Sequence, residues 1–190
     1  DASDDGSIPN LPPNLTTLDL SNNNFDGSLP SNLGSLTSLE SLDLTGNDFD
    51  GPIPDLSSLT ELTQLDLSGN DFGDTNGDGV IDASDDGSIP NLPPNLTTLD
   101  LSDNNMSGPF PDLSNLTALE VVDLSGNQFA GEVPDSFWQL PNLASINLSG
   151  NLLSGIIPNS ICNDFNDFTN SDFSGNSFCE PYPSCIEGFI

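Results

Sequence analysis

A nine-residue unit, Leu-x-x-Leu-x-Leu-x-x-Asn, recurs along the chain and constrains the fold more than any other feature. It begins at Leu15, Leu39, Leu62, Leu96, Leu119, Leu143 and, with substitutions, Phe168. All but one of the complete repeats are about 23 to 25 residues long. A fixed period of this length is typical of a solenoid, in which each repeat forms one coil that contacts only its neighbours.

Within each unit, the alternation of Leu with polar residues predicts a short β-strand. In Thr17–Leu20, for example, the two Leu side chains face inward and the Thr and Asp side chains face outward, because side chains alternate along a strand. Stacked coils then form a parallel sheet on one face of the molecule. A single coil cannot bury its own leucines, so neighbouring coils must cover them.

The Asn that ends each unit has a structural role in this prediction. The chain turns there, and the turn leaves backbone donors and acceptors inside the stack. An Asn side chain carries both a donor and an acceptor, so it can satisfy both kinds of group. We expect this role for Asn23, Asn47, Asn70, Asn104, Asn127, Asn151 and Asn176. The apolar residue two positions later, usually Phe, is expected in the core.

After most units the chain continues with Gly-x-apolar-Pro, as in Gly27–Pro30, Gly51–Pro54 and Gly155–Pro158. The whole pattern resembles the plant-type leucine-rich repeat over nearly the entire chain. The resemblance implies an α/β-type leucine-rich-repeat solenoid, a curved right-handed stack of coils with a parallel β-sheet on its concave face and little regular helix. We expect a single domain over 1–190, with the tail of a preceding coil at 1–14, six coils over 15–167, a loop insertion at 73–86 and a disulfide cap at 168–190.

A longer repeat overlies the coils. Residues 1–21 and 82–102 are identical, which gives a period of about 81 residues containing three coils and one inserted loop. Because the chain starts where such a loop ends, we expect a stretch like Asp74–Ile81 upstream in the full protein.

The inserted loop carries the most readable chemistry in the sequence. It matches a calcium loop in which positions 1, 3, 5, 7, 9 and 12 supply oxygen ligands and Gly79, at position 6, allows the sharp turn. The predicted Ca²⁺ ligands are Asp74, Asn76, Asp78, the Val80 carbonyl, Asp82 and Asp85. An acidic turn without metal is the alternative, since Asp, Asn and Gly also favour turns.

The loop resembles that of EF-hands, but Asp85 stands where the EF-hand pattern has Glu, and no flanking EF helices are readable. It is therefore more similar to dockerin-type repeats. The resemblance implies bound calcium without the opening that sensor EF-hands undergo. We expect Ca²⁺ to fold the insertion and to neutralise part of the local charge.

Acidic residues dominate the charge of the chain. It has 30 Asp and Glu and no Lys, Arg or His, for a formal net charge of −30. Such a surface disfavours nucleic acid and anionic lipid, and it suits a calcium-rich extracellular environment. The residue between the last two strand leucines predicts a column of carboxylates on the sheet, formed by Asp19, Asp43, Asp66, Asp100, Asp123 and Asp172, with Asn147 in one coil. We interpret this column as a solvated stripe rather than a cation-binding site.

Three cysteines, Cys162, Cys179 and Cys185, lie together in the last repeat and tail, which indicates an oxidising, extracellular compartment. Alignment of the last coils places Cys162 and Cys185 about one strand spacing apart, within reach of a disulfide. We favour this pairing over the alternative, Cys179–Cys185. One option for the remaining cysteine is a disulfide with a cysteine beyond Ile190.

Five Asn-x-Ser/Thr sequons are candidate N-glycosylation sites, at Asn14, Asn95, Asn105, Asn115 and Asn147. A glycan on Asn147 would stand on the sheet and obstruct it. No apolar run approaches the roughly 20 residues that a membrane span needs.

The sequence argues against catalysis. His and Lys are absent, the cysteines belong to the cap, and the repeated Asp residues are alike, whereas an acid and a base must differ. We therefore expect an extracellular calcium-binding protein with a structural, adhesive or self-assembling role, in which fibrils or arrays form. The alternative is a ligand-recognition module, like a receptor ectodomain or an inhibitor, whose concave face binds a protein, peptide or glycan. Ice binding through Ser and Thr ladders is a third option, which the Asp column disfavours.

Overall fold

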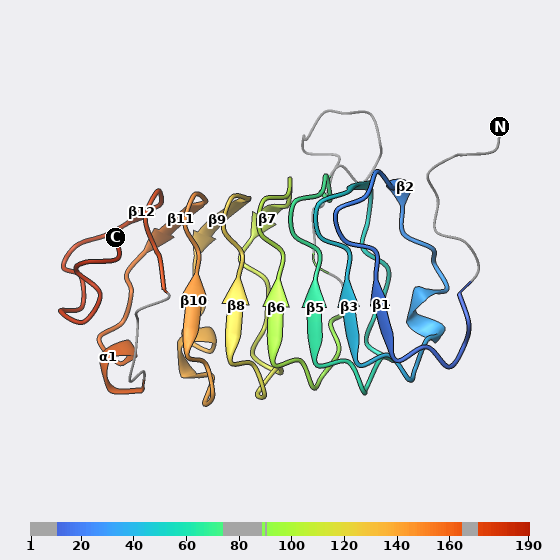
Figure 1. Ribbon diagram of the computed structural model, residues 1–190. Helices are drawn as coiled ribbons and strands as arrows, with labels where there is room; N and C mark the ends of the chain where they lie inside the picture. Colours follow the sequence, from blue (N-terminus) through green and yellow to red (C-terminus); the bar gives the residue numbers. More distant parts are fainter. Residues whose placement is uncertain (1–10, 74–88, 90, 165–170) are drawn as a thin grey trace.

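The computed structural model describes residues 11–73, 89, 91–164 and 171–190. In these residues the chain is a solenoid of short parallel strands, with successive coils stacked in sequence order (Figure 1). The predicted leucine-rich-repeat architecture, with a parallel sheet on one face and little helix, is confirmed.

The main sheet has six parallel strands in the order β1-β3-β5-β6-β8-β10. They are β1 (Thr17–Asp19), β3 (Ser41–Asp43), β5 (Gln64–Asp66), β6 (Thr98–Asp100), β8 (Val121–Asp123) and β10 (Ser145–Asn147). Equivalent residues of successive units pair, so that Leu65 lies between Leu42 and Leu99. β5 and β6 are neighbours although the insertion separates them in sequence, so the insertion leaves the main sheet continuous.

Second strands follow the Asn turns and form two smaller parallel sheets. One pairs β2 (Asp26–Ser28) with β4 (Asp48–Asp50). The other contains β7 (Ser107–Pro109), β9 (Gln128–Glu132), β11 (Leu152–Gly155) and β12 (Ser177–Phe178). The coil of β5 lies between these two sheets, and there the chain leaves for the insertion through Gly73. Gly73 has a φ of 126°, and a Cβ atom at this position would overlap the backbone of Asn105.

Among the described residues, helix occurs in short segments only. They are the 3-10 helices η1 (Leu33–Ser35) and η2 (Phe137–Gln139) and the α-helix α1 (Ile161–Asp164). None of the helices formed by the described residues is long and apolar enough to cross a membrane.

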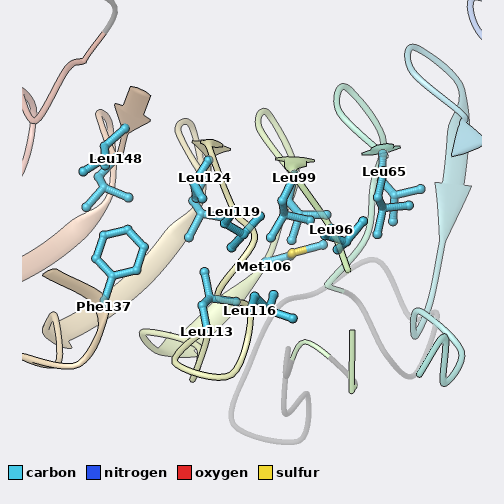
Figure 2. Close-up of a cluster of buried hydrophobic side chains, with 14 of the residues drawn as sticks. Leu65, Leu96, Leu99, Met106, Leu113, Leu116, Leu119, Leu124, Phe137 and Leu148 are labelled. Carbon is cyan, nitrogen blue, oxygen red and sulfur yellow. The ribbon is translucent and has the colours of Figure 1, made fainter. Parts of the chain in front are cut away.

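Leucines from successive coils form one continuous core between the main sheet and the opposite side. Leu65, Leu99 and Leu124, from three successive coils, are fully buried (Figure 2). The predicted Phe positions are also in the core. The rings of Phe25 and Phe49 stack with centroids 5.9 Å apart, and those of Phe49 and Phe72 with centroids 6.4 Å apart.

The predicted role of the Asn column is confirmed by its hydrogen bonds. Asn70 Nδ2 donates to the carbonyl of Leu67 at 3.1 Å and to that of Leu44, in the preceding coil, at 3.0 Å. Its Oδ1 accepts from the Phe49 N–H at 3.1 Å. Asn47, Asn104, Asn127, Asn151 and Asn176 likewise bond backbone groups of two adjacent coils, which ties the coils together. Asn23, in the first described coil, is exposed and its Nδ2 bonds carbonyls of its own coil.

A cap closes the C-terminal end of the core. A disulfide joins Cys162 to Cys185, the pairing that alignment of the coils favours, with Cα atoms 5.6 Å apart. The Phe173 N–H donates to the Phe189 carbonyl at 2.7 Å, and Ile186 is fully buried. Cys179 is exposed, with a free thiol.

Candidate functional site

The exposed face of the main sheet presents polar side chains in aligned rows, and we call it the acidic face. Strand register places each predicted column residue beside its equivalent in the next coil. The column consists of Asp19, Asp43, Asp66, Asp100, Asp123, Asn147 and Asp172. One flanking row consists of Thr17, Ser41, Gln64, Thr98, Val121 and Ser145, and the other of Ser21, Thr45, Ser68, Ser102, Ser125, Ser149 and Ser174.

Each carboxylate of the column is oriented by the Ser or Thr two residues later. Asp66 Oδ1 accepts from the Ser68 N–H at 3.0 Å and from the Ser68 hydroxyl at 2.7 Å. The pairs Asp19–Ser21, Asp43–Thr45, Asp100–Ser102 and Asp123–Ser125 repeat this arrangement. In the part of the chain that the structure describes, Oδ2 of Asp43, Asp66 and Asp100 accepts no hydrogen bond, so these oxygens remain for a ligand.

The carboxylates differ in their electrostatic surroundings. Hydrogen bonds from Ser21 hold the pKa of Asp19, at the end of the sheet, below its ordinary value. Burial raises the pKa of Asp100, where the Ser102 hydrogen bonds oppose the rise and the charges of Asp66 and Asp123 add to it. The ionised form of Asp100 is therefore destabilised in the folded protein, and a cationic group beside it would stabilise that form.

Asn147 interrupts the column and contacts it. Its Nδ2 donates to Asp123 Oδ2 at 2.9 Å and to the Ser125 hydroxyl at 3.2 Å. Its Oδ1 accepts from the Ser149 N–H and hydroxyl, as an Asp would. An Asn therefore preserves the turn, and here it also occupies an oxygen of the neighbouring carboxylate.

Sequence reasoning missed one apolar side chain on the acidic face. Val121 lies in the row between Thr98 and Ser145 and is 38% exposed. The signal was present in the sequence, because the other coils have a Thr, Ser or Gln at this place. Val121 is adjacent to the buried part of the column and offers a small apolar contact.

The candidate glycosylation residues lie in different environments and do not gather in one place. Asn14, Asn95 and Asn115 are exposed. Asn95 Nδ2 donates to the Thr60 carbonyl, and Asn105 Nδ2 donates to Asp71 Oδ1.

The predicted calcium ligands Asp74, Asn76, Asp78, Val80, Asp82 and Asp85 lie outside the described residues. Close to where the insertion returns to the body, a hollow of about 470 Å³ lies away from the acidic face. Ile89, Leu92, Phe110, Leu113 and Leu116 provide most of its apolar lining. The lining of this hollow contains one carboxylate, Asp112, so few of the molecule's negative charges lie there.

Comparisons with known families agree with this architecture. Models of the leucine-rich repeat match residues 13–54, where the match is to two copies, 58–75 and 94–153. Pollen receptor-like kinase 5 of Arabidopsis thaliana is 42% identical over 50 residues, which are 26% of this chain and 7% of that protein. The chain thus matches only a small fraction of the length of this relative.

Solved structures show the same likeness over most of the chain. The PEPR1–AtPEP1 complex superimposes with a TM-score of 0.75 at 33% identity, over 94% of this chain and 25% of that chain. PEPR1 is a leucine-rich repeat receptor-like protein kinase of Arabidopsis thaliana. The ectodomain of the Arabidopsis receptor kinase HAESA, in complex with an IDA peptide hormone ligand, gives a TM-score of 0.72 at 28% identity, over 94% of this chain and 28% of that chain.

Proposed function

Because the chain is built from leucine-rich repeats of the plant type, we propose that it is an extracellular ligand-recognition module without catalytic activity. We propose further that its acidic face binds a basic protein or peptide. The observation that carries the proposal is the column of carboxylates in strand register, with Oδ2 of Asp43, Asp66 and Asp100 free to accept. The chain has no Lys, Arg or His of its own to neutralise these charges.

The receptor likenesses support recognition better than they support the structural or adhesive role expected from the sequence. The HAESA ectodomain is solved in complex with a peptide hormone ligand, and the PEPR1 structure is named together with AtPEP1. The disulfide and the receptor-ectodomain likeness support an extracellular location. Fibril or array formation has no comparable support.

The energetics of the acidic face favour a cationic ligand. Neighbouring strands lie about 4.8 Å apart, so adjacent column carboxylates repel each other by about 1 kcal/mol in water and more near a protein surface. A guanidinium or ammonium group placed between two Oδ2 atoms replaces this repulsion by attraction. Arg fits best, because its planar fork can donate to two carboxylates or to both oxygens of one.

Binding of a labelled Arg-rich peptide tests the proposal, with a peptide of equal length carrying Glu in place of Arg for comparison. The informative variant combines Asp43→Asn, Asp66→Asn and Asp100→Asn, because Asn147 shows that Asn preserves the turn. Exposed charge pairs contribute about 0.2 to 1 kcal/mol each, so loss of three should weaken binding between about threefold and a hundredfold.

The matched control combines Asp26→Asn, Asp48→Asn and Asp50→Asn, which removes the same charge from the β2–β4 sheet. We expect this variant to bind nearly as well as the unmodified chain. Equal losses in the two variants would mean that only the net charge attracts the peptide, and the acidic face would not be its site.

We also propose that the insertion binds Ca²⁺ through Asp74, Asn76, Asp78, the Val80 carbonyl, Asp82 and Asp85. The support is the agreement of ligand types and spacing in the sequence. In this proposal calcium stabilises the coil that carries the insertion, and the acidic face provides the recognition surface.

A further inference from the structure

One coil in the middle of the stack is shorter than the coils on either side of it. The stretch 89–96, which leads into β6, is two residues shorter than the equivalent stretches 53–62 and 110–119. Each of the two longer stretches has three leucines spaced three positions apart, and the middle ones are Leu59 and Leu116. The short stretch has no leucine at the corresponding place, so one apolar side chain is missing from this layer of the solenoid.

The hollow of about 470 Å³ lies at this shortened coil. In the complete coil, Ile53 and Leu56 are buried. Their equivalents in the short coil, Ile89 and Leu92, are only partly buried and line the hollow. Leu116 lines it from the next coil (Figure 2). The missing leucine therefore leaves apolar surface uncovered between two coils that are otherwise stacked.

The lining separates into an apolar floor and a polar rim. The buried side chains that form the floor are those of Phe110, Leu113, Leu116 and Phe129. The exposed polar residues of the rim are Asn91, Asp112 and Asn115. Small-molecule sites in proteins combine a mostly apolar lining with a few polar groups and have volumes of roughly 300 to 1,000 Å³. The hollow has this construction and this size.

Asp112 determines which sign of charge fits the rim. Its Oδ1 accepts from the Ser114 N–H at 3.0 Å. Hydrogen bonds from Ser114 hold the pKa of Asp112 below its ordinary value, so the carboxylate is ionised at neutral pH. The chain has no Lys, Arg or His to neutralise it. An apolar molecule with an acidic group would be repelled here, whereas one with a basic group would be attracted.

We propose that the hollow binds a small organic amine, whose apolar body takes the place of the missing leucine and whose ammonium group lies beside Asp112. An apolar cavity of about 150 Å³ is large enough to bind benzene. The hollow, at about 470 Å³, has room for a fused aromatic ring with a short aminoalkyl chain. This site is separate from the acidic face, and it does not depend on the peptide binding proposed there.

The first test titrates the whole chain with tryptamine and follows leucine methyl signals by NMR. The signals of Leu113 and Leu116, which line the hollow, are expected to shift. Those of Leu56 and Leu59, the equivalent residues of the complete coil, should not. Absence of a shift at Leu113 and Leu116 would overturn the proposal, because the hollow would then be closed to the probe. Equal shifts at both pairs would also overturn it.

Two further probes separate the contribution of the ring from that of the charge. Indole-3-acetate carries the same ring with a negative charge, and ethylamine carries the positive charge without the ring. Tryptamine is expected to bind about tenfold more tightly than either, because only tryptamine combines ring burial with attraction to Asp112. Equal binding of indole-3-acetate would exclude recognition of a cation, and equal binding of ethylamine would exclude the apolar floor as part of the site.

Asp112→Asn tests the rim directly, and Asp55→Asn is its matched control. Asp55 lies in the same sequence, Pro-Asp-Leu-Ser, and its Oδ1 accepts from the Ser57 N–H at 2.9 Å. Loss of an exposed charge pair should weaken tryptamine binding roughly 1.5- to 5-fold in the Asp112 variant. The control should bind as the unmodified chain does. Equal effects of the two substitutions would assign the attraction to net charge and overturn the proposal.

A graft restores the missing leucine. Residues 55–62 in place of 91–96 give the short coil its full length and an equivalent of Leu59. Tryptamine should then no longer shift the Leu116 methyl signals, while the signals of Leu65 and Leu99 show that the core is intact. Unchanged binding in a graft with an intact core would contradict the proposal. If the graft disrupts the core, the comparison of Asp112→Asn with Asp55→Asn decides.

Discussion

Asp19 and Asp100 show that position in the stack, rather than local sequence, controls the behaviour of a side chain. Both lie in the sequence Thr-Leu-Asp-Leu-Ser, and both accept the same two hydrogen bonds from the following Ser. The pKa of Asp19 is nevertheless lowered, while that of Asp100 is raised by burial and by two carboxylate neighbours. The sequence predicted the column but could not distinguish its members, because the distinction depends on which coils lie on either side.

The raised pKa of Asp100 predicts a pH-dependent stability. The folded protein binds the Asp100 proton more tightly than the unfolded chain does, because the pKa is raised above its ordinary value of 3.8. The free energy of unfolding therefore falls as the pH rises from the ordinary pKa through the raised pKa. Asp100→Asn should therefore stabilise the protein at pH 7, by no more than about 1 kcal/mol because solvent screens a carboxyl that is only partly buried. The gain should disappear below the ordinary pKa, and urea unfolding at both pH values measures it.

Asp19→Asn is the matched control for this prediction. Because its pKa is lowered, Asp19 contributes stability above the ordinary value, and this stability is lost as the pH falls through the folded pKa. The substitution should therefore give no gain at pH 7. Equal gains for the two variants would show that relief of net charge, and not the position of Asp100 in the column, is responsible.

The Asn column gives a second comparison at the residue scale. Asn104→Ala leaves the Phe72 N–H and the carbonyls of Leu67 and Leu101 without their partner inside the stack. Each buried group left unpaired costs about 1 to 3 kcal/mol. Asn23→Ala should cost less, because Asn23 is exposed and water can replace its bonds. Denaturant unfolding of both variants checks this, and equal losses would contradict the assigned role.

At the scale of the elements, the sequence predicted the main strands but missed the second ones. Leu alternation identified strands such as β1 and β6, because one face of each is buried. β2 and β7 consist of Asp-Gly-Ser and Ser-Gly-Pro, whose Gly, Pro and Asp are depleted in strands. They pair because stacking of the coils places equivalent backbone segments side by side, an effect that no single repeat reveals.

The C-terminal cap gives a prediction at the element scale. The disulfide joins two cysteines 23 residues apart in sequence. Removal of a cross-link that closes a loop of this size lowers the free energy of unfolding by about 3 kcal/mol. Cys162→Ala with Cys185→Ala should therefore loosen residues 171–190 before the rest of the solenoid unfolds. The single Trp reports on this, because the rings of Trp138 and Phe173 lie 6.2 Å apart.

Thermal unfolding followed by Trp138 fluorescence should show an earlier transition in the double variant. Cys179→Ala is the control, because this cysteine is exposed and free, and it should leave the transition unchanged. If the double variant and the unmodified chain gave the same fluorescence transition, the cap would not depend on the disulfide.

At the scale of the whole molecule, the features that made the fold predictable also concealed the function. A constant period determines where strands, turns and core residues lie, since every coil repeats the same local solution. A ligand site depends on departures from the period, such as Val121, the contact between Asn147 and Asp123, and the difference between the end coil and the interior. The sequence predicts a structural, adhesive or self-assembling role, whereas the receptor likenesses favour recognition.

Calcium dependence is the last prediction, and it concerns the stability of the whole solenoid. If the insertion binds Ca²⁺ only in the folded protein, a hundredfold excess over Kd should stabilise it by about 2.7 kcal/mol. For a chain of this size each 1 kcal/mol raises Tm by roughly 2 to 4 °C. Removal of Ca²⁺ with EDTA should therefore lower Tm by several degrees.

The formal net charge of −30 complicates this measurement, because any divalent cation screens self-repulsion. Mg²⁺ at equal concentration controls for screening, and the combined variant Asp74→Ala and Asp78→Ala removes two predicted ligands. Asp48→Ala with Asp50→Ala removes equal charge outside the insertion. A specific site requires that Ca²⁺ raise Tm more than Mg²⁺ does, and that only the variant in the insertion lose this difference. A Tm that responds equally to both ions in all three proteins would reduce the effect of calcium to screening.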